Sequence, residues 1–151
     1  MQIASENQAL DILHDVTRSS ELRVKAARYL GGNHAARIIQ NLVQALQDDD
    51  FGVRWEAAEA LAKCGPVALP EMLKALTDPK QVSDPRVRRS IYHALHEIDD
   101  PELQRQTAGL MEALRGPAAA IAAMMAAGAL RLKRQKEKAA QLRSIGGRPA
   151  N

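Results

Sequence analysis

Apolar residues recur at helical spacing in three similar stretches of the chain. One face of the stretch 53–64 carries apolar residues separated by four, four and three positions, as in an α-helix: Val53, Ala57, Leu61 and Cys64. The stretches 22–30 and 87–95 repeat this pattern, offset from it by 31 residues upstream and 34 residues downstream. We therefore predict three equivalent helices at regular intervals.

A second apolar pattern lies between these helices and follows the same period. It occurs at residues 42–46, 72–76 and 110–114, with a weaker copy at Ile12 and Leu13. Each repeating unit therefore holds two helices, for which we expect lengths of about 12–15 residues. A repeat of this length is typical of helical pairs stacked in an array. The chain has room for about four such pairs.

Helix-breaking residues fall where this phasing requires them. Glycine, aspartate and proline close the successive units at 31–33, 65–66 and 99–101, and Gly116-Pro117 divides the fourth unit. Capping and turn residues separate the two helices of a unit, and they are Ser19-Ser20, Asp48-Asp49-Asp50 and Asp84-Pro85. The third unit carries additional residues, 79–83, in its internal turn.

The predicted fold is an all-α, right-handed solenoid. Alanine at the centre of the apolar stripe lets neighbouring helices approach closely, and a single helical pair of this size cannot bury its own apolar face, so the pairs must stack. The pattern of an aspartate, Val-Arg-x-x-Ala-Ala-x-x-Leu and a closing glycine resembles the HEAT repeat, in the short form found in phycobilisome lyases. The resemblance is close over residues 1–98 and loose over 99–130. It implies an α-solenoid of about four HEAT-like helical hairpins.

Composition and cysteine content narrow the class further. Aromatic residues make up 3% of the chain, which excludes an all-β fold. The single cysteine excludes a disulfide-stapled secreted module. The first ten residues include Glu6 and several polar residues, unlike a secretory leader. We therefore expect a cytoplasmic protein.

Charge divides the chain into two parts. The formal net charge is +3, yet residues 131–151 carry seven basic side chains and one acidic one, which leaves residues 1–130 at −3. We predict a solenoid over 1–130, with 116–130 as a buried capping helix, and a basic C-terminal helical extension with a flexible tail over 131–151. The extension could meet acidic protein, nucleic acid or membrane. Its basic residues are Arg131, Lys133, Arg134, Lys136, Lys138 and Arg143.

The residues that suggest chemistry have simpler structural interpretations. Arg23, Arg54 and Arg88 occupy one repeat position, and the HEAT resemblance implies that they form a structural ladder between turns. HEAT-like hydroxylases hold two irons with repeated His-Glu pairs, whereas this chain has a single such pair, His96-Glu97, with His93 one turn before Glu97. We therefore predict no metal, no other cofactor and no catalytic residue. Cys64 on the apolar stripe is expected to act as a small hydrophobe.

The remaining candidate is a surface. The second helices of an α-solenoid line its concave face, and their positions outside the stacking stripe point outward. An outward tryptophan among charges is typical of an interface anchor, so we predict a groove centred on Trp55; the alternative is that Trp55 covers its own repeat. The predicted partner-binding residues are Lys25, Arg28, Trp55, Glu56, Glu59, Arg89, Ser90 and His93.

These features favour a non-enzymatic adaptor or assembly factor. It would hold a protein partner in the concave groove and use the basic tail as a second contact. An alternative is a nucleic-acid-binding module that uses the tail and the arginine ladder. A third possibility, implied by the resemblance alone, is a bilin-lyase-like or metal-dependent enzyme.

Overall fold

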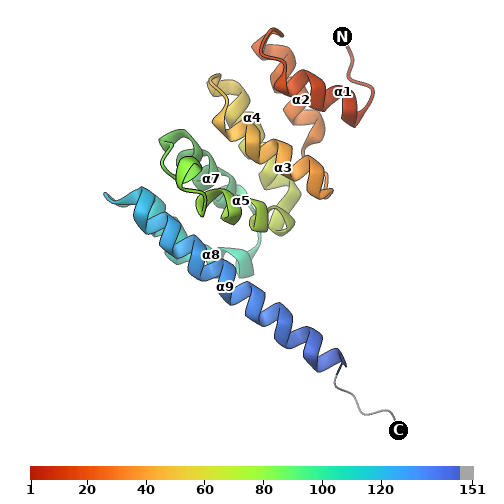
Figure 1. The fold of residues 1–151 in the computed structure, drawn as a ribbon. Coiled ribbons are helices and arrows are strands. Elements are labelled where there is room, and N and C mark those ends of the chain that lie inside the picture. The colour runs from red at the N-terminus through yellow and green to blue at the C-terminus, as the bar shows by residue number, and fades with distance from the viewer. Residues whose placement is uncertain (147–151) are drawn as a thin grey trace.

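The computed structural model describes residues 1–146 as a series of helices, and contains no strand in that range (Figure 1). The elements in chain order are α1 (Glu6–His14), α2 (Ser20–Leu30), α3 (Ala36–Gln44), the 3₁₀ turn η1 (Ala45–Gln47), α4 (Phe51–Cys64), the 3₁₀ turn η2 (Gly65–Ala68), α5 (Leu69–Leu76), α6 (Pro79–Val82), α7 (Pro85–Glu97), α8 (Pro101–Arg115) and α9 (Ala119–Gly146).

Helix starts follow the capping residues in the sequence. The side chains of Ser19, Asp50, Asp84 and Asp100 each accept a hydrogen bond from a backbone amide in the first turn of α2, α4, α7 and α8 respectively. At the end of α4, Gly65 adopts a φ of 74°, a conformation that favours glycine. The predicted turns within units, and the predicted boundaries between units at 31–33, 65–66 and 99–101, are therefore confirmed.

The predicted helix lengths are wrong for the first helix of each of the first three pairs. The helices α1, α3 and α5 have nine, nine and eight residues, shorter than the expected 12–15. The 3₁₀ turns η1 and η2 take up residues that adjoin α3 and α5. Only the second helices α4 and α7, with 14 and 13 residues, reach the expected length among the first three pairs.

Helices of the same kind stack on one another along the chain. In the row of second helices α2 packs against α4 and α4 against α7, while α3 packs against α5 in the other row. The predicted apolar stripe of α4 is buried along its whole length, from Val53 to Cys64. Just after the end of α2, a Cβ on Gly31 would lie 3.2 Å from the Cα of Ala60 on α4, a tight contact that favours glycine there. This arrangement is the predicted helical solenoid.

The last pair departs from the pattern of the others. Its first helix, α8, packs against α7, whereas its second helix, α9, packs against α5 and α6. The two helices have thus exchanged rows relative to the earlier pairs. The connection from α7 to α8 spans residues 98–100, which keeps α8 beside α7.

Helix α9 is longer and more exposed than the predicted capping helix. It runs without a break from Ala119 to Gly146, through the boundary predicted at residue 131. Ala123, Ala127 and Leu130 are buried, but Ile121 and Met125 are 65% and 69% exposed, so the prediction that 116–130 is buried was wrong for one face. Residues 135–146 are exposed throughout, and this half of α9 projects from the other helices (Figure 1).

The predicted flexible tail falls partly on residues 147–151, which lie outside the described residues. Over the described part of the chain, every helix is too short or too polar to cross a bilayer.

Candidate functional site

An exposed aromatic pair lies on the outer side of α4. Trp55 is 47% exposed, and Phe51, one turn earlier, is 66% exposed, with the two ring centroids 6.0 Å apart. Side chains four residues apart share a helix face, which brings these rings together. Sequence reasoning identified Trp55 and missed Phe51, although the spacing was the signal that could have found it.

Trp55 packs against the next repeat. Its ring centroid lies 4.0 Å from that of His93 on α7, and His93 Nε2 lies 2.7 Å from Glu59 Oε1 on α4. The Glu59 contact therefore sets the orientation of the imidazole against which Trp55 packs, with the two ring planes tilted by 34°. Trp55, Glu59 and His93 form one cluster between two repeats. Trp55 therefore contacts the next repeat, whereas the alternative prediction was that it covers its own repeat.

Arginine side chains surround this cluster. A shallow hollow of about 160 Å³ lies between α4 and α7, and its lining residues are Phe51, Arg54, Trp55, Ala58, Arg86, Arg89, Ser90 and His93. The Arg54 guanidinium carbon lies 5.7 Å from the centre of the Phe51 ring. Arg89 is exposed and makes no ion pair or side-chain hydrogen bond within residues 1–146. The hollow therefore has aromatic walls and a positively charged rim.

Two predicted surface residues are buried, which corrects their assignment. Glu56 is 8% exposed, and its carboxylate accepts hydrogen bonds of 3.3 and 3.2 Å from Nε and Nη2 of Arg28. Ser90 is also buried, although part of it lines the hollow. Glu56 points toward α2 because it has a guanidinium partner there, and this hydrogen bonding raises the pKa of Arg28. Lys25 is exposed and pairs with Glu21 of its own helix at 3.4 Å.

The predicted arginine ladder holds turns together. Nε and Nη2 of buried Arg23 donate to the Leu13 carbonyl oxygen at 3.0 and 2.9 Å, and the same guanidinium pairs with the Asp48 carboxylate of the next unit. Arg54 donates to the carbonyl oxygens of Asp48 and Asp49. Thus Arg23 connects two turns and Arg54 closes its own turn.

The third ladder position behaves differently from the first. Arg88 donates to the Val82 carbonyl oxygen of its own turn at 2.7 Å. The contact between turns is made two residues earlier, by Arg86, which pairs with Asp84 at 3.0 Å and with Asp49 of the preceding unit at 2.9 Å. These hydrogen bonds, first of all that to Asp84, raise the pKa of Arg86. Sequence reasoning missed Arg86 because it lies outside the repeated position.

The residues considered for catalysis have structural partners. His93 contacts Glu59 rather than Glu97, whose carboxylate lies 3.4 Å from Nδ1 of His96. Cys64 is buried, its thiol lies 3.2 Å from the carbonyl oxygens of Asn33 and Ala60, and burial raises its pKa. Residues 1–146 contain no cluster of three His, Cys, Asp or Glu side chains with the geometry of a metal site.

Comparison with known proteins agrees with this architecture. The family model for HEAT repeats matches residues 6–82, more than half of the chain, and the matched segment covers α1 to α6. No curated protein matches the sequence. HEAT repeats generally mediate contacts between proteins. The repeat pattern, the stacked helical pairs and the family match together show that this chain belongs to the HEAT-repeat family.

Proposed function

We propose that this protein is a non-enzymatic adaptor or assembly factor that binds a protein partner through the second-helix face, meaning the exposed residues of α2, α4 and α7. The observation that carries the proposal is the exposed pair of Trp55 and Phe51, which lies with half-buried His93 beside the guanidinium groups of Arg54 and Arg89. Tryptophan and arginine are the residue types that most often dominate the binding energy of protein interfaces.

The size of the hollow favours a protein partner over a small molecule. Its volume of about 160 Å³ is below the roughly 300–1,000 Å³ of typical ligand pockets. Its walls are aromatic side chains that remain largely in contact with solvent. A large partner surface can cover such side chains, whereas a small ligand would leave them partly hydrated.

Nucleic acid is a weaker candidate for this face. The arginine ladder, on which that alternative depended, is engaged: Arg23, Arg54 and Arg88 donate to turn carbonyls or to Asp48. A guanidinium used in this way has fewer donors available for phosphate. The basic residues of 131–151 are proposed as the second contact of the adaptor, and the single cysteine supports a cytoplasmic setting.

The proposal is tested by comparing the proteins retained by the wild-type chain with those retained by Trp55→Ala. Purified chains are immobilised and exposed to extract of the source organism, and retained proteins are quantified by mass spectrometry. We expect a stoichiometric partner that is lost by about tenfold or more, since an anchor residue contributes about 2 kcal/mol or more. Val16→Ala, which removes an exposed apolar side chain from the turn after α1, should retain it.

Circular dichroism of each variant separates loss of binding from loss of fold. Trp55 is half exposed, so its removal should leave helicity unchanged. Equal retention of the partner by the wild type and Trp55→Ala, with intact helicity, would refute the proposed face.

A further inference from the structure

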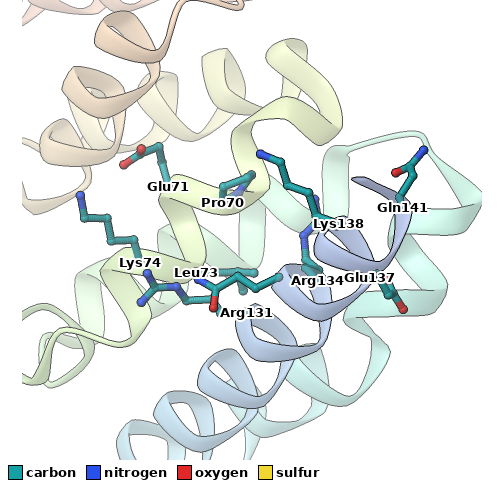
Figure 2. Close-up of a pocket in the computed structure, with 10 residues that line it drawn as sticks. Pro70, Glu71, Leu73, Lys74, Arg131, Arg134, Glu137, Lys138 and Gln141 are labelled. Atoms are coloured by element: carbon teal, nitrogen blue, oxygen red, sulfur yellow. The ribbon is translucent and has the colours of Figure 1, made fainter. Parts of the chain in front are cut away.

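A second concave surface lies between α5 and the projecting half of α9. This α5–α9 groove has a volume of about 500 Å³ and is lined by Pro70, Glu71, Leu73, Lys74, Arg131, Arg134, Gln135, Glu137, Lys138 and Gln141. Figure 2 shows Arg131, Arg134 and Lys138 following one another along α9 beside Pro70, Leu73 and Lys74 of α5. The groove is distinct from the second-helix face, because it shares no lining residue with the hollow around Trp55.

The groove continues the face by which α9 packs on the body. Ala127 is buried in that face, and five helical turns of 3.6 residues place Ile145 in line with it. Arg134 and Lys138 lie between them on the same side. Beyond Arg134 this face has no helix over it, and Ile145 is 70% exposed. The inner face of α9 is therefore an apolar and basic surface that lacks a partner in its second half.

Positive charge exceeds negative charge in the groove. Lys74, Arg131, Arg134 and Lys138 face two carboxylates, Glu71 and Glu137. None of the four basic side chains makes an ion pair within residues 1–146.

Two of these basic groups are already oriented. Nη1 of Arg131 donates to Thr77 Oγ1 at 2.8 Å, and Nη1 of Arg134 donates to Gln106 Oε1 at 2.9 Å. Each guanidinium keeps donors for a ligand, because it has five N–H groups. Neutral partners hold the arginines in place without satisfying their charge.

We infer that the α5–α9 groove binds an acidic segment of a protein partner that also carries apolar side chains. Its carboxylates would meet Arg131, Arg134 and Lys138, and its apolar residues would cover Leu142 and Ile145, which are exposed near the end of α9. The inference names the site of the proposed second contact and rests on the proposed function only in taking the partner to be a protein. Docking of a peptide segment between helices is a common mode of recognition.

The arrangement of charge on α9 favours an acidic segment over nucleic acid. A continuous row of phosphates would be repelled by Glu71 and Glu137 in the lining, whereas a segment of mixed sequence can place apolar residues opposite these two carboxylates. Three further basic residues, Lys133, Lys136 and Arg143, are absent from the groove lining and lie on the opposite side of α9. A nucleic acid attracted by total charge would use both sides of the helix, whereas a segment in the groove uses one.

This two-sided distribution provides a matched control. We propose to measure binding of a fluorescent synthetic peptide of about 15 residues, with leucine at helical spacing and glutamate elsewhere, to the full chain. The inner triple variant is Arg131→Gln, Arg134→Gln and Lys138→Gln; the outer triple variant is Lys133→Gln, Lys136→Gln and Arg143→Gln. Both remove three positive charges. We expect the inner triple to weaken binding by about tenfold or more and the outer triple by less than about threefold.

Equal weakening by the two triple variants would overturn the inference. So would tighter binding of a single-stranded DNA oligonucleotide of the same length, weakened alike by both variants, since that result identifies a nucleic-acid surface. A peptide of the same composition in scrambled order should bind more weakly; if it binds equally well, charge alone is responsible and the groove is refuted.

Lys74→Glu is a second test of the groove, needed because the inner triple variant could alter the fold of α9. Lys74 is an exposed residue of α5, so its substitution leaves α9 and its hydrogen bonds untouched. It should weaken peptide binding as well, and unchanged binding would contradict the groove. Trp55→Ala should leave peptide binding unchanged, so failure of the groove and failure of the second-helix face give different results.

Discussion

At the scale of single residues, Trp55 is positioned by a neighbour from another repeat. The imidazole of His93 packs against the indole ring, with centroids 4.0 Å apart and the ring planes tilted by 34°, and Glu59 contacts that imidazole at Nε2. A tryptophan supported in this way loses little side-chain freedom when a partner covers it, which reduces the entropic cost of binding.

This contact between the Trp55 and His93 rings predicts a change in fluorescence. His93→Ala should make the emission of Trp55 shift toward that of solvent-exposed tryptophan, because the ring loses its neighbour on α7. Since Trp55 is the single tryptophan of the chain, the signal has no other source. His96→Ala, which removes the partner of Glu97, should leave the emission unchanged. Identical spectra for the wild type and His93→Ala would show that the two rings are not in contact in solution.

Arg23 should contribute strongly to stability. Arg23→Ala leaves the Asp48 carboxylate without its guanidinium partner in a mostly buried site, so we expect the free energy of unfolding to fall by about 3–5 kcal/mol. Arg105→Ala breaks an exposed pair with Glu102 and should leave the free energy of unfolding nearly unchanged, because water screens that pair. Chemical denaturation measures both; a loss for Arg23→Ala no larger than that for Arg105→Ala would refute the structural role of the ladder.

Sequence periodicity predicted the positions of Arg23 and Trp55, but it did not predict which side chains they and their neighbours contact. The repeat position of Arg23 and the helix face of Trp55 follow from local spacing. The partners do not, because Glu56 and His93 each meet a side chain about 30 positions away, at distances set by how neighbouring repeats stack. Glu56 was therefore expected at the surface, and Phe51 and Arg86 were missed.

At the scale of helices, α9 combines two different environments. Its first half packs against α5 and α8, whereas its residues 135–146 are exposed. Composition alone separated the basic segment from the rest of the chain. It did not show that one unbroken helix runs from the apolar segment into the basic one. The helix continues because alanine, lysine, arginine, glutamine and leucine, which dominate both segments, all favour helix.

Truncation should distinguish the two halves of α9. A chain ending at Gln135 should keep the thermal stability of the full chain, since the residues removed bury little surface. A chain ending at Gly116 should melt at a clearly lower temperature, because it loses the buried residues Ala123, Ala127 and Leu130 and uncovers α5 and α8. Thermal melts followed by circular dichroism test both expectations. A large loss of stability in the longer chain would mean that the projecting half packs on the body.

At the scale of the whole molecule, the repeats are joined by carboxylates as well as by apolar contacts. Asp50 caps α4, and its carboxylate accepts a hydrogen bond from Ser20 of the preceding repeat, which lowers its pKa below the ordinary value of 3.8. Arg86 likewise lowers the pKa of Asp84. Because these pKa values are lower in the folded chain, protonation favours unfolding.

Stability should therefore depend on acid pH. The contribution of Asp50 is fully present above about pH 3.8 and is lost as the pH falls through its lowered pKa. We expect the difference in free energy of unfolding between the wild type and Asp50→Asn to be constant from pH 7 to pH 5 and to shrink below pH 3.8. Asp99→Asn, at an exposed position before α8, should show no such difference. A wild-type advantage that persists unchanged at pH 2 would contradict this assignment.

The period of the apolar pattern was sufficient to predict the solenoid. What it did not predict is the exchange of rows by α8 and α9. That feature depends on the short connection at 98–100 and on which faces of α5 and α7 remain open, and neither is visible in a repeat pattern.

The central claim, that the second-helix face holds a protein partner, is tested most directly by photo-crosslinking from position 55 in living cells. A photoreactive phenylalanine replaces Trp55, or Val16 as the control, and Arg89→Glu is added to the first variant in a further strain. We predict a light-dependent protein adduct at position 55 that is absent at position 16 and lost with Arg89→Glu. An adduct with nucleic acid, equal adducts at the two positions, or no adduct at position 55 would contradict the claim.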